Sequence, residues 1–484
     1  MSTRPGVSLV AAALAIATGS GSAQQARVAA VPASPAQVPL AAVDRYVRDE
    51  IRRERVPGVS VAVVRGGKII LARGYGEANV ELHAPATDST VYQSGSVGKQ
   101  FTAALILRLA AAGRLGLDDP IRRHLPEGPP AWDSITIRHL LTHTSGIADY
   151  TDSSVSYQRA YTEDELVRIA ARLPLQFRAG DHWRYSNTGY LLLGAIVRRV
   201  TGVFYGDLLR QEIFAPLGMR TARIISEADI VPNRAAGYEL EHDSLHNQAW
   251  VNPSLNTTAD GALYLTVHDL ARWVIGWDEG RVLSAGDRET AWTPVRLNDG
   301  SSYAYGFGWE LTELRAHRRI GHTGSWQGFR TSIQRFPAQD LTVIVLANLD
   351  RARPEAMSLA IAGLLAPALV PPHRLPAPLP GPRPPVPIDS LLRRVIDDSD
   401  SVMVTPQLHH FLGKAERDDW KELASLPRWT QLGCERPTDH PIVRLGSPVA
   451  WLCYARGEGP AGGTAITAFY TEDWHAADIE GYGY

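Results

Sequence analysis

A dense run of proline divides this chain. Nine of the seventeen residues from Pro371 to Pro387 are proline. Because proline lacks a backbone N–H and fixes φ, such a run can form neither the interior of a helix nor a central strand. It predicts a stiff, extended linker over 367–387 that separates a large domain (40–366) from a small one (388–484).

The chain is long enough to bury large cores in two domains, with 484 residues of which 44% are hydrophobic. Its formal net charge is only −2, and it has no basic runs. This balance argues against a nucleic-acid partner and against binding to an anionic membrane surface.

The first residues have the pattern of a secretory signal. Met1–Ala23 contains a basic residue at Arg4, an apolar stretch over Val7–Ala17 and a small-residue end, and 24–39 reads as a low-complexity spacer. No lipid anchor is expected, since no cysteine lies near the cleavage point. Because no later run approaches 18 apolar residues, no stable membrane insertion is expected after cleavage. The mature protein is predicted to be secreted or periplasmic.

Cys434 and Cys453 are the only cysteines. In an exported chain the oxidising compartment favours a disulfide between them, which would stabilise the small domain by about 3 kcal/mol. Two buried free thiols are the alternative.

Helices and strands are mixed in the large domain. Strand-like runs at 59–64 and 68–73 flank the turn pair Gly66-Gly67 and predict a hairpin, and a second hairpin or edge pair is expected near Ile320 and 341–346. Helices are predicted at 41–55, 163–171, 190–200 and 267–273, the last opened by a capping pattern at Thr266 and Asp269. An antiparallel sheet packed with helices is expected.

The small domain is predicted to be α+β. Helical stretches at 391–396 and 416–425 precede strand-like runs at 449–454 and 464–470. A module for stability or for covering substrate is the simplest interpretation. A binding module for a cell-envelope polymer or another partner is the alternative, and the sequence does not identify a partner for it.

A lysine gives the first indication of the reaction chemistry. Only four of the 49 basic residues are lysines, and one of them, Lys99, lies three residues after Ser96. Arginine can replace lysine where a permanent charge suffices, but only lysine can lose its proton when partly buried. At positions i and i+3 of a helix the two side chains share a face, so the amine can activate the hydroxyl as a nucleophile.

The run Gln100–Ala112 predicts a helix that has Ser96 in its first turn, where the helix dipole stabilises negative charge. Alone, a Ser-x-x-Lys tetrapeptide is weak, because composition gives about one chance match in four such chains.

Three short motifs follow one another along the large domain: Ser96-Val97-Gly98-Lys99, Tyr185-Ser186-Asn187 and His322-Thr323-Gly324. In this order they resemble the signature of the class C β-lactamase and D,D-peptidase (penicillin-binding) family of serine hydrolases. The similarity covers roughly Val43 to Leu349 and includes Leu140–Gly146, Leu217–Met219 and Tyr305–Trp309. It implies an α+β fold: an antiparallel sheet with flanking helices plus an all-helical subdomain.

The resemblance also implies a catalytic set of Ser96, Lys99 and Tyr185. Ser96 would attack a carbonyl carbon and become acylated. Tyr185, as a phenolate or sharing its proton with Lys99, would take the hydroxyl proton and later give one to the leaving group. Positive charge on Lys99 and His322 would lower the cost of forming that phenolate.

Substrate binding is implied for Asn187, His322, Thr323, Gly324 and Ser325. Asn187 would hold the Lys99 amine or a substrate amide, and the oxyanion would lie between the backbone N–H groups of Ser96 and Ser325. A histidine at 322, where β-lactamases usually carry lysine, would bind a substrate carboxylate less well above neutral pH. With histidine at 322 and serine at 186, the motifs resemble those of the D,D-carboxypeptidase and D-aminopeptidase branches more than those of the dedicated β-lactamases.

Two other kinds of site are disfavoured. His139 and His143 have the i, i+4 spacing of a metal site but lack a neighbouring Glu and a third ligand, so a structural role is expected and no metal or cofactor is predicted. The lipase motif G-x-S-x-G is absent around Ser96.

These observations predict an exported serine hydrolase that acts through an acyl-enzyme on Ser96. Peptides containing D-amino acids are the expected substrates, with cell-wall peptide as one source. Ester or weak β-lactam hydrolysis at the same site is the alternative. A penicillin-binding sensor or scaffold without turnover is a second one.

Overall fold

The computed structural model describes residues 39–152, 154–224, 229–375, 379–397, 403–412, 417, 420–421, 424–459 and 462–484. The predicted signal segment 1–23 and the spacer before residue 39 lie outside these ranges.

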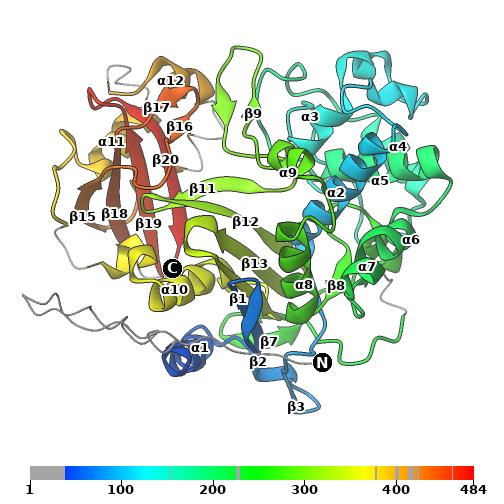
Figure 1. Cartoon of the computed structure of the whole chain (residues 1–484), viewed down its shortest axis with the longest axis horizontal. Helices are drawn as coiled ribbons and strands as arrows, with labels where there is room; N and C mark the ends of the chain where they lie inside the picture. Colours follow the sequence, from blue (N-terminus) through cyan, green and yellow to red (C-terminus); the bar gives the residue numbers. More distant parts are fainter. Residues whose placement is uncertain are drawn as a thin grey trace, which may run out of the picture. The chain divides into compact units, whose positions relative to one another are not determined.

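A seven-stranded antiparallel sheet forms the centre of the large domain, in the order β11-β12-β13-β14-β1-β2-β3 (Figure 1). Strands β1 and β14 are mostly apolar because they are buried on both faces, with the polar residues Ser60 in β1 and Thr342 in β14 also buried. The strands are β1 Gly58–Arg65, β2 Lys68–Asn79, β3 Ala84–Pro85, β11 Glu310–Leu314, β12 His317–Trp326, β13 Phe329–Phe336 and β14 Leu341–Ala347.

The predicted hairpin at 59–64 and 68–73 is confirmed. Strands β1 and β2 pair in antiparallel fashion, and Gly66 and Gly67 join them with φ of 59° and 65°. A two-residue hairpin with the usual right-handed twist needs positive φ at both positions, which glycine adopts without steric cost.

The second predicted pair, near Ile320 and 341–346, is wrong, because these two segments do not pair with each other. Ile320 lies in β12 and 341–346 lies in β14, but β13 runs between these strands and pairs with both. The sequence pattern does not reveal β13, because Thr331, Ser332 and Gln334 are polar although they are buried.

Helices cover both faces of the sheet. Helices α1 (Leu40–Arg53) and α10 (Pro354–Leu365) pack on one face and α8 (Val267–Asp278) packs on the other (Figure 1). The predicted cap of α8 is confirmed, since Thr266 and Asp269 exchange side-chain to backbone hydrogen bonds. The helix continues five residues past the predicted end.

The other helices of the large domain gather around α5 in an all-helical subdomain. They are α2 Lys99–Ala111, α3 Ile137–Leu141, α4 Glu163–Ala170, α5 Asn187–Thr201 and α6 Tyr205–Leu209, with short α7 Ala215–Leu217 and α9 Ala285–Ala291 nearby in sequence. Short strands complete the domain: β4 Tyr92–Gln93, β5 Arg223–Ile224, β6 Tyr238–Glu241, β7 Ser244–Asn247, β8 Leu263–Leu265, β9 Val295–Arg296 and β10 Ser302–Tyr303.

The small C-terminal domain contains a four-stranded antiparallel sheet, β15-β18-β19-β20. Cys434 of β15 and Cys453 of β18 lie opposite each other and form a disulfide. Half of the predicted helix 416–425 lies outside the described residues; of the described half, 417, 420, 421 and 424 are helical. The elements are α11 Ile388–Ile396, α12 Pro406–Phe411, β15 Arg428–Glu435, β16 Val443–Arg444, β17 Ser447–Pro448, β18 Trp451–Gly459, β19 Gly462–Tyr470 and β20 Ala476–Gly483.

The proline-rich stretch contains 3₁₀ turns at Pro367–Leu369 and Pro372–Arg374. Further on, the Leu379 N–H donates to the Leu432 carbonyl of β15 at 2.6 Å. The stretch therefore covers an edge strand that would otherwise present unpaired backbone groups.

Buried charges connect the C-terminal domain to the large sheet. Arg444 pairs with Glu313 of β11, and its other nitrogen lies 2.7 Å from Glu480 and 3.5 Å from Asp478. The Arg444 and Glu313 side chains are only 2% and 7% exposed. No helix within the described ranges is long and apolar enough to span a bilayer.

Candidate active site

Ser96 lies in a 3₁₀ turn, η1 (Gly95–Gly98), directly before α2, and not in the first turn of the α-helix as expected. Side chains at i and i+3 of a 3₁₀ turn are eclipsed, so Ser96 and Lys99 face the same way. Gly95 has a φ of 51°, and a Cβ there would lie 2.4 Å from the Ser325 backbone nitrogen. Glycine thus lets β12 approach the nucleophile turn closely.

Lys99 is completely buried, and its amine has three oxygen neighbours. Nζ lies 2.6 Å from the Asp260 carbonyl oxygen, 2.7 Å from Asn187 Oδ1 and 3.1 Å from Ser96 Oγ. The first two oxygens can only accept. A neutral amine that donates to both of them keeps its lone pair for the Ser96 hydroxyl.

The surroundings of Lys99 favour that neutral amine. Burial lowers the pKa of Lys99 to about 8, while the nearby Asp260 and Asp149 carboxylates keep it from falling further. At mildly alkaline pH a large fraction of Lys99 is therefore an unprotonated base.

Asn187 holds the Lys99 amine, which is one of the two roles expected for it. Its Nδ2 donates to Asp149 Oδ2 at 3.1 Å, and its backbone N–H donates to the same oxygen at 2.7 Å. Asp149 thereby fixes the amide so that Oδ1 faces Lys99.

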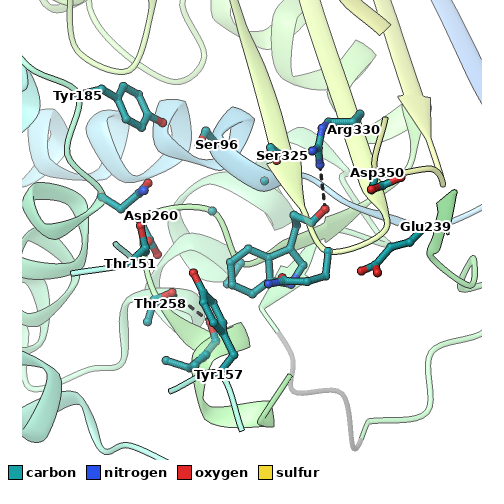
Figure 2. A pocket seen from close by; sticks show the side chains of 17 residues that line it. Ser96, Thr151, Tyr157, Tyr185, Glu239, Thr258, Asp260, Ser325, Arg330 and Asp350 are labelled. Carbon is teal, nitrogen blue, oxygen red and sulfur yellow. Dashed lines mark hydrogen bonds between the residues drawn. The ribbon is translucent and has the colours of Figure 1, made fainter. Parts of the chain in front are cut away.

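Tyr185 does not have the surroundings of a phenolate. Its hydroxyl points toward Ser96 (Figure 2) and has no hydrogen-bond partner among the described residues. Lys99 Nζ lies 4.9 Å from the centre of the ring, over its face. Burial raises the pKa of Tyr185 well above its usual value, and the Ser96 hydroxyl offsets only part of this. These surroundings favour the neutral phenol over the phenolate, which was one of the two forms expected for Tyr185.

A directed chain of hydrogen bonds connects the second motif to the third. The Ser186 N–H donates to His143 Nδ1 (3.2 Å), so His143 must carry its proton on Nε2 and donate to Tyr305 Oη (3.2 Å). Tyr305 then donates to His322 Nε2 (2.9 Å), and His322 Nδ1 donates to the Thr323 carbonyl (2.6 Å). Each donor in this series of hydrogen bonds thus has one acceptor.

The expected role of His322 in substrate binding is therefore wrong. His322 is 2% exposed, and both of its ring nitrogens bond to protein groups. Burial lowers its pKa to about 3. It carries no charge for a substrate carboxylate, and the predicted weakening of binding above neutral pH does not apply.

His139 and His143 have separate structural roles. His139 Nδ1 accepts the Thr136 N–H at the start of α3 at 3.1 Å. The ring of His143 packs against Tyr185 at a tilt of 36°, with centroids 4.3 Å apart, and burial lowers the pKa of His143 well below its usual value. No metal-binding group of His, Cys, Asp and Glu occurs within the described part of the chain.

A cavity of about 470 Å³ opens at Ser96 (Figure 2). Tyr185, Asn187 and Ser325 also line it, whereas His322, Thr323 and Gly324 do not. Gly324 packs against the nucleophile segment instead: a Cβ there would lie 2.0 Å from the Ser94 carbonyl oxygen.

Sequence reasoning missed Asp149, Asp260 and Tyr305. Asp260 holds Lys99 through its backbone carbonyl, which any residue could supply. Tyr305 lies inside the family-like stretch 305–309, and this was the one available signal for it.

Known proteins match both the sequence and the fold. A family model described as Beta-lactamase matches residues 43–367. Penicillin-binding protein 4* of Bacillus subtilis (strain 168) is 32% identical over 60% of this chain and 68% of its own length. D-aminopeptidase of Gluconobacter oxydans (strain 621H) is 30% identical over 66% of this chain and 60% of its own length, so less than two thirds of that relative is spanned.

Two solved structures extend this similarity. The octameric penicillin-binding protein homologue from Pyrococcus abyssi has the same fold, with a TM-score of 0.63 over 92% of this chain and 96% of its own at 23% identity. The D-amino acid amidase from Ochrobactrum anthropi SV3, complexed with D-phenylalanine, has a TM-score of 0.58 over 64% of this chain and 91% of its own at 26% identity. Since the family model spans more than half of the sequence and contains all three motifs, this chain belongs to the beta-lactamase family of serine hydrolases.

Proposed function

We propose that this protein is an exported hydrolase that forms an acyl-enzyme on Ser96 and cleaves amide bonds of D-amino-acid substrates. One observation carries the proposal: a buried amine with a lowered pKa lies 3.1 Å from the hydroxyl of a serine that lines a cavity. A nucleophile next to a base of matched pKa is the arrangement that acyl transfer needs.

Acylation begins with proton transfer from Ser96 Oγ to the neutral Lys99 amine. Oγ then bonds to the substrate carbonyl carbon, whose oxygen takes the negative charge. Ser96 and Ser325 border the cavity there, and their backbone N–H groups are the proposed oxyanion donors. The resulting Lys99 ammonium is stabilised by the Asp260 carbonyl and Asn187 Oδ1.

Tyr185 is the proposed acid for the leaving group. When the bond between the carbonyl carbon and the leaving nitrogen breaks, that nitrogen needs a proton. The Tyr185 hydroxyl is neutral, points to Ser96 and has no other partner in the described residues. The proton on Lys99 then restores the phenol, and water hydrolyses the acyl-enzyme by the reverse steps.

The D-amino-acid substrate is supported by the relatives. A D-aminopeptidase and a D-amino acid amidase are among the similar proteins, at 30% and 26% identity. Export is supported by the secretory pattern of Met1–Ala23.

Intact-mass spectrometry with p-nitrophenyl acetate tests the acyl-enzyme. We expect a transient acetyl adduct on the wild-type protein but not on Ser96→Ala. The control Ser89→Ala, seven residues before Ser96, should also form the adduct. Equal adduct formation by Ser96→Ala would refute the role of Ser96.

Stereospecificity is tested by ammonia release from the two enantiomers of alaninamide. We expect release from D-alaninamide but not from L-alaninamide, and equal release from both would remove the D-amino-acid part of the proposal.

A further inference from the structure

The cavity at Ser96 is acidic. Asp260, Glu239 and Asp350 line it, and Arg330 is the only cationic lining residue among those described. Figure 2 shows Asp260 on one wall, beside Thr151, and the other two acids with Arg330 on the opposite side. Three carboxylates against one guanidinium favour a ligand with positive charge.

One nitrogen of Arg330 is already bound to the protein. Its Nη1 donates to the backbone carbonyls of Trp326 (3.1 Å) and Phe329 (3.0 Å). Asp350 is its electrostatic neighbour and partly compensates its charge. With His322 neutral and turned inward, a carboxylate on the substrate has no cationic partner that is uncompensated.

Asp260 is the acid nearest to the reacting groups. Its backbone carbonyl accepts from Lys99 at 2.6 Å, and Lys99 in turn contacts Ser96. The residue is 7% exposed and lines the cavity. Oδ2 accepts the Tyr150 hydroxyl at 2.9 Å. The Thr258 side chain and the Asp260 backbone N–H also interact with this carboxylate. A carboxylate offers about four acceptor sites, so room remains for one further donor.

We propose that the substrate carries a protonated amino group on its acyl side and that the Asp260 carboxylate binds this group. The inference rests on the proposed function and narrows it to substrates with a free amine, as opposed to substrates recognised by a terminal carboxylate. A charged hydrogen bond between an ammonium and a buried carboxylate is among the stronger polar contacts in proteins.

Binding at Asp260 would also assist the base. The Asp260 charge favours the protonated form of Lys99. An ammonium placed beside Asp260 compensates that charge and so shifts Lys99 toward the neutral amine. The substrate that fits the cavity thereby helps to prepare Lys99 for the Ser96 proton.

Two anilides with the same leaving group test the inference: D-alanine p-nitroanilide and N-acetyl-D-alanine p-nitroanilide. For the wild-type protein at pH 7 we expect kcat/KM to be about thirtyfold higher for the free amine. The preference should decline above pH 8 as the substrate amine, whose pKa is about 8, loses its proton. Asp260→Asn should bring the ratio close to one, while Asp243→Asn, an exposed control, should keep it.

The outcomes separate the inference from the proposed function. Equal rates on both anilides, a preference for the acetylated one, or cleavage of neither would overturn the inference, while Ser96-dependent ester hydrolysis would leave the proposed function standing. The wild-type comparison does not depend on the folding of any variant. An equal loss on both anilides in Asp260→Asn would overturn the assignment of the ammonium to Asp260. Ester hydrolysis that survives Ser96→Ala would sink the proposed function itself.

Discussion

Lys99 is a cation without a carboxylate in direct contact. Its amine meets two carbonyl-type oxygens and one hydroxyl, while Asp260 and Asp149 act on it only through space. Burial therefore costs the ammonium more than these contacts return, and its pKa falls to about 8. An arginine could not respond in this way, because its guanidinium stays charged at any pH that a protein survives.

The pH dependence of activity should follow this amine. Because only the neutral form accepts the Ser96 proton, kcat/KM for p-nitrophenyl acetate should rise with pH and level off above about 8. No inflection is expected near pH 6.5, since the pKa of His322 is about 3. An inflection near 6.5 that disappears in His322→Gln would contradict this picture.

Replacing the amine should abolish turnover without unfolding the protein. Lys99→Met keeps the length and apolar stem of the side chain, so stability should change little, while kcat/KM should fall by about 10³-fold or more. Lys68→Met, at an exposed hairpin position, is the control and should retain full activity. Thermal unfolding of both variants distinguishes loss of base from loss of fold, and a Lys99→Met protein with near-normal kcat/KM would exclude Lys99 as the base.

At the scale of elements, the geometry of the site depends on three segments whose hydrogen bonds lie behind the cavity wall. The turn after α3 supplies His143, the start of α5 supplies Ser186, and β12 supplies His322, with Tyr305 between them. His143 also packs against the Tyr185 ring. This series of hydrogen bonds thus positions Tyr185, the proposed acid, relative to the strand that contains Ser325.

Tyr305→Phe should reveal this positioning role. Loss of its hydroxyl leaves buried nitrogens of His143 and His322 without a partner, so we expect kcat to fall by about tenfold or more with little change in KM. Tyr303→Phe removes a hydroxyl two residues away that has no such role and should behave as wild type. Equal kinetics for the two variants would argue against the positioning role.

At the scale of the whole molecule, the C-terminal domain supplies the positive charge that pairs with a buried carboxylate of the large domain. Arg444 lies among Glu313, Asp478 and Glu480, and burial raises the pKa of Glu480 to about 7. Through Glu480 the folded state binds more protons than the unfolded chain between about pH 4.5 and 7, so the contribution of this residue to stability falls as pH rises through that range.

Arg444→Met should destabilise the protein by about 3–5 kcal/mol, because it leaves buried carboxylates without their counter-charge. The loss should be larger at pH 8 than at pH 5, where the acids can take up protons. Arg436→Met, which removes an exposed pair with Glu472, should cost much less, because water and salt screen such a pair. Denaturant unfolding at both pH values measures these effects, and a loss independent of pH would argue against unpaired carboxylates as the cause.

The sequence predicts the parts of this site that depend on local spacing. Ser96 and Lys99 are three residues apart, and the order of the motifs indicates the fold. It does not predict the state of His322, because burial and the Tyr305 contact arise only when distant segments meet. It also hides β13, whose polar residues are buried, and Asp260, whose backbone rather than side chain holds Lys99.

The shared ion cluster has a consequence for how such a protein can change over time. Glu313 belongs to the large sheet, yet its charge is matched by Arg444 from the other side of the proline-rich stretch. A gene fusion that exchanged the C-terminal module for an unrelated one would remove Arg444 and leave Glu313 without this counter-charge. A replacement module that buries Glu313 would need a positive charge at the same place.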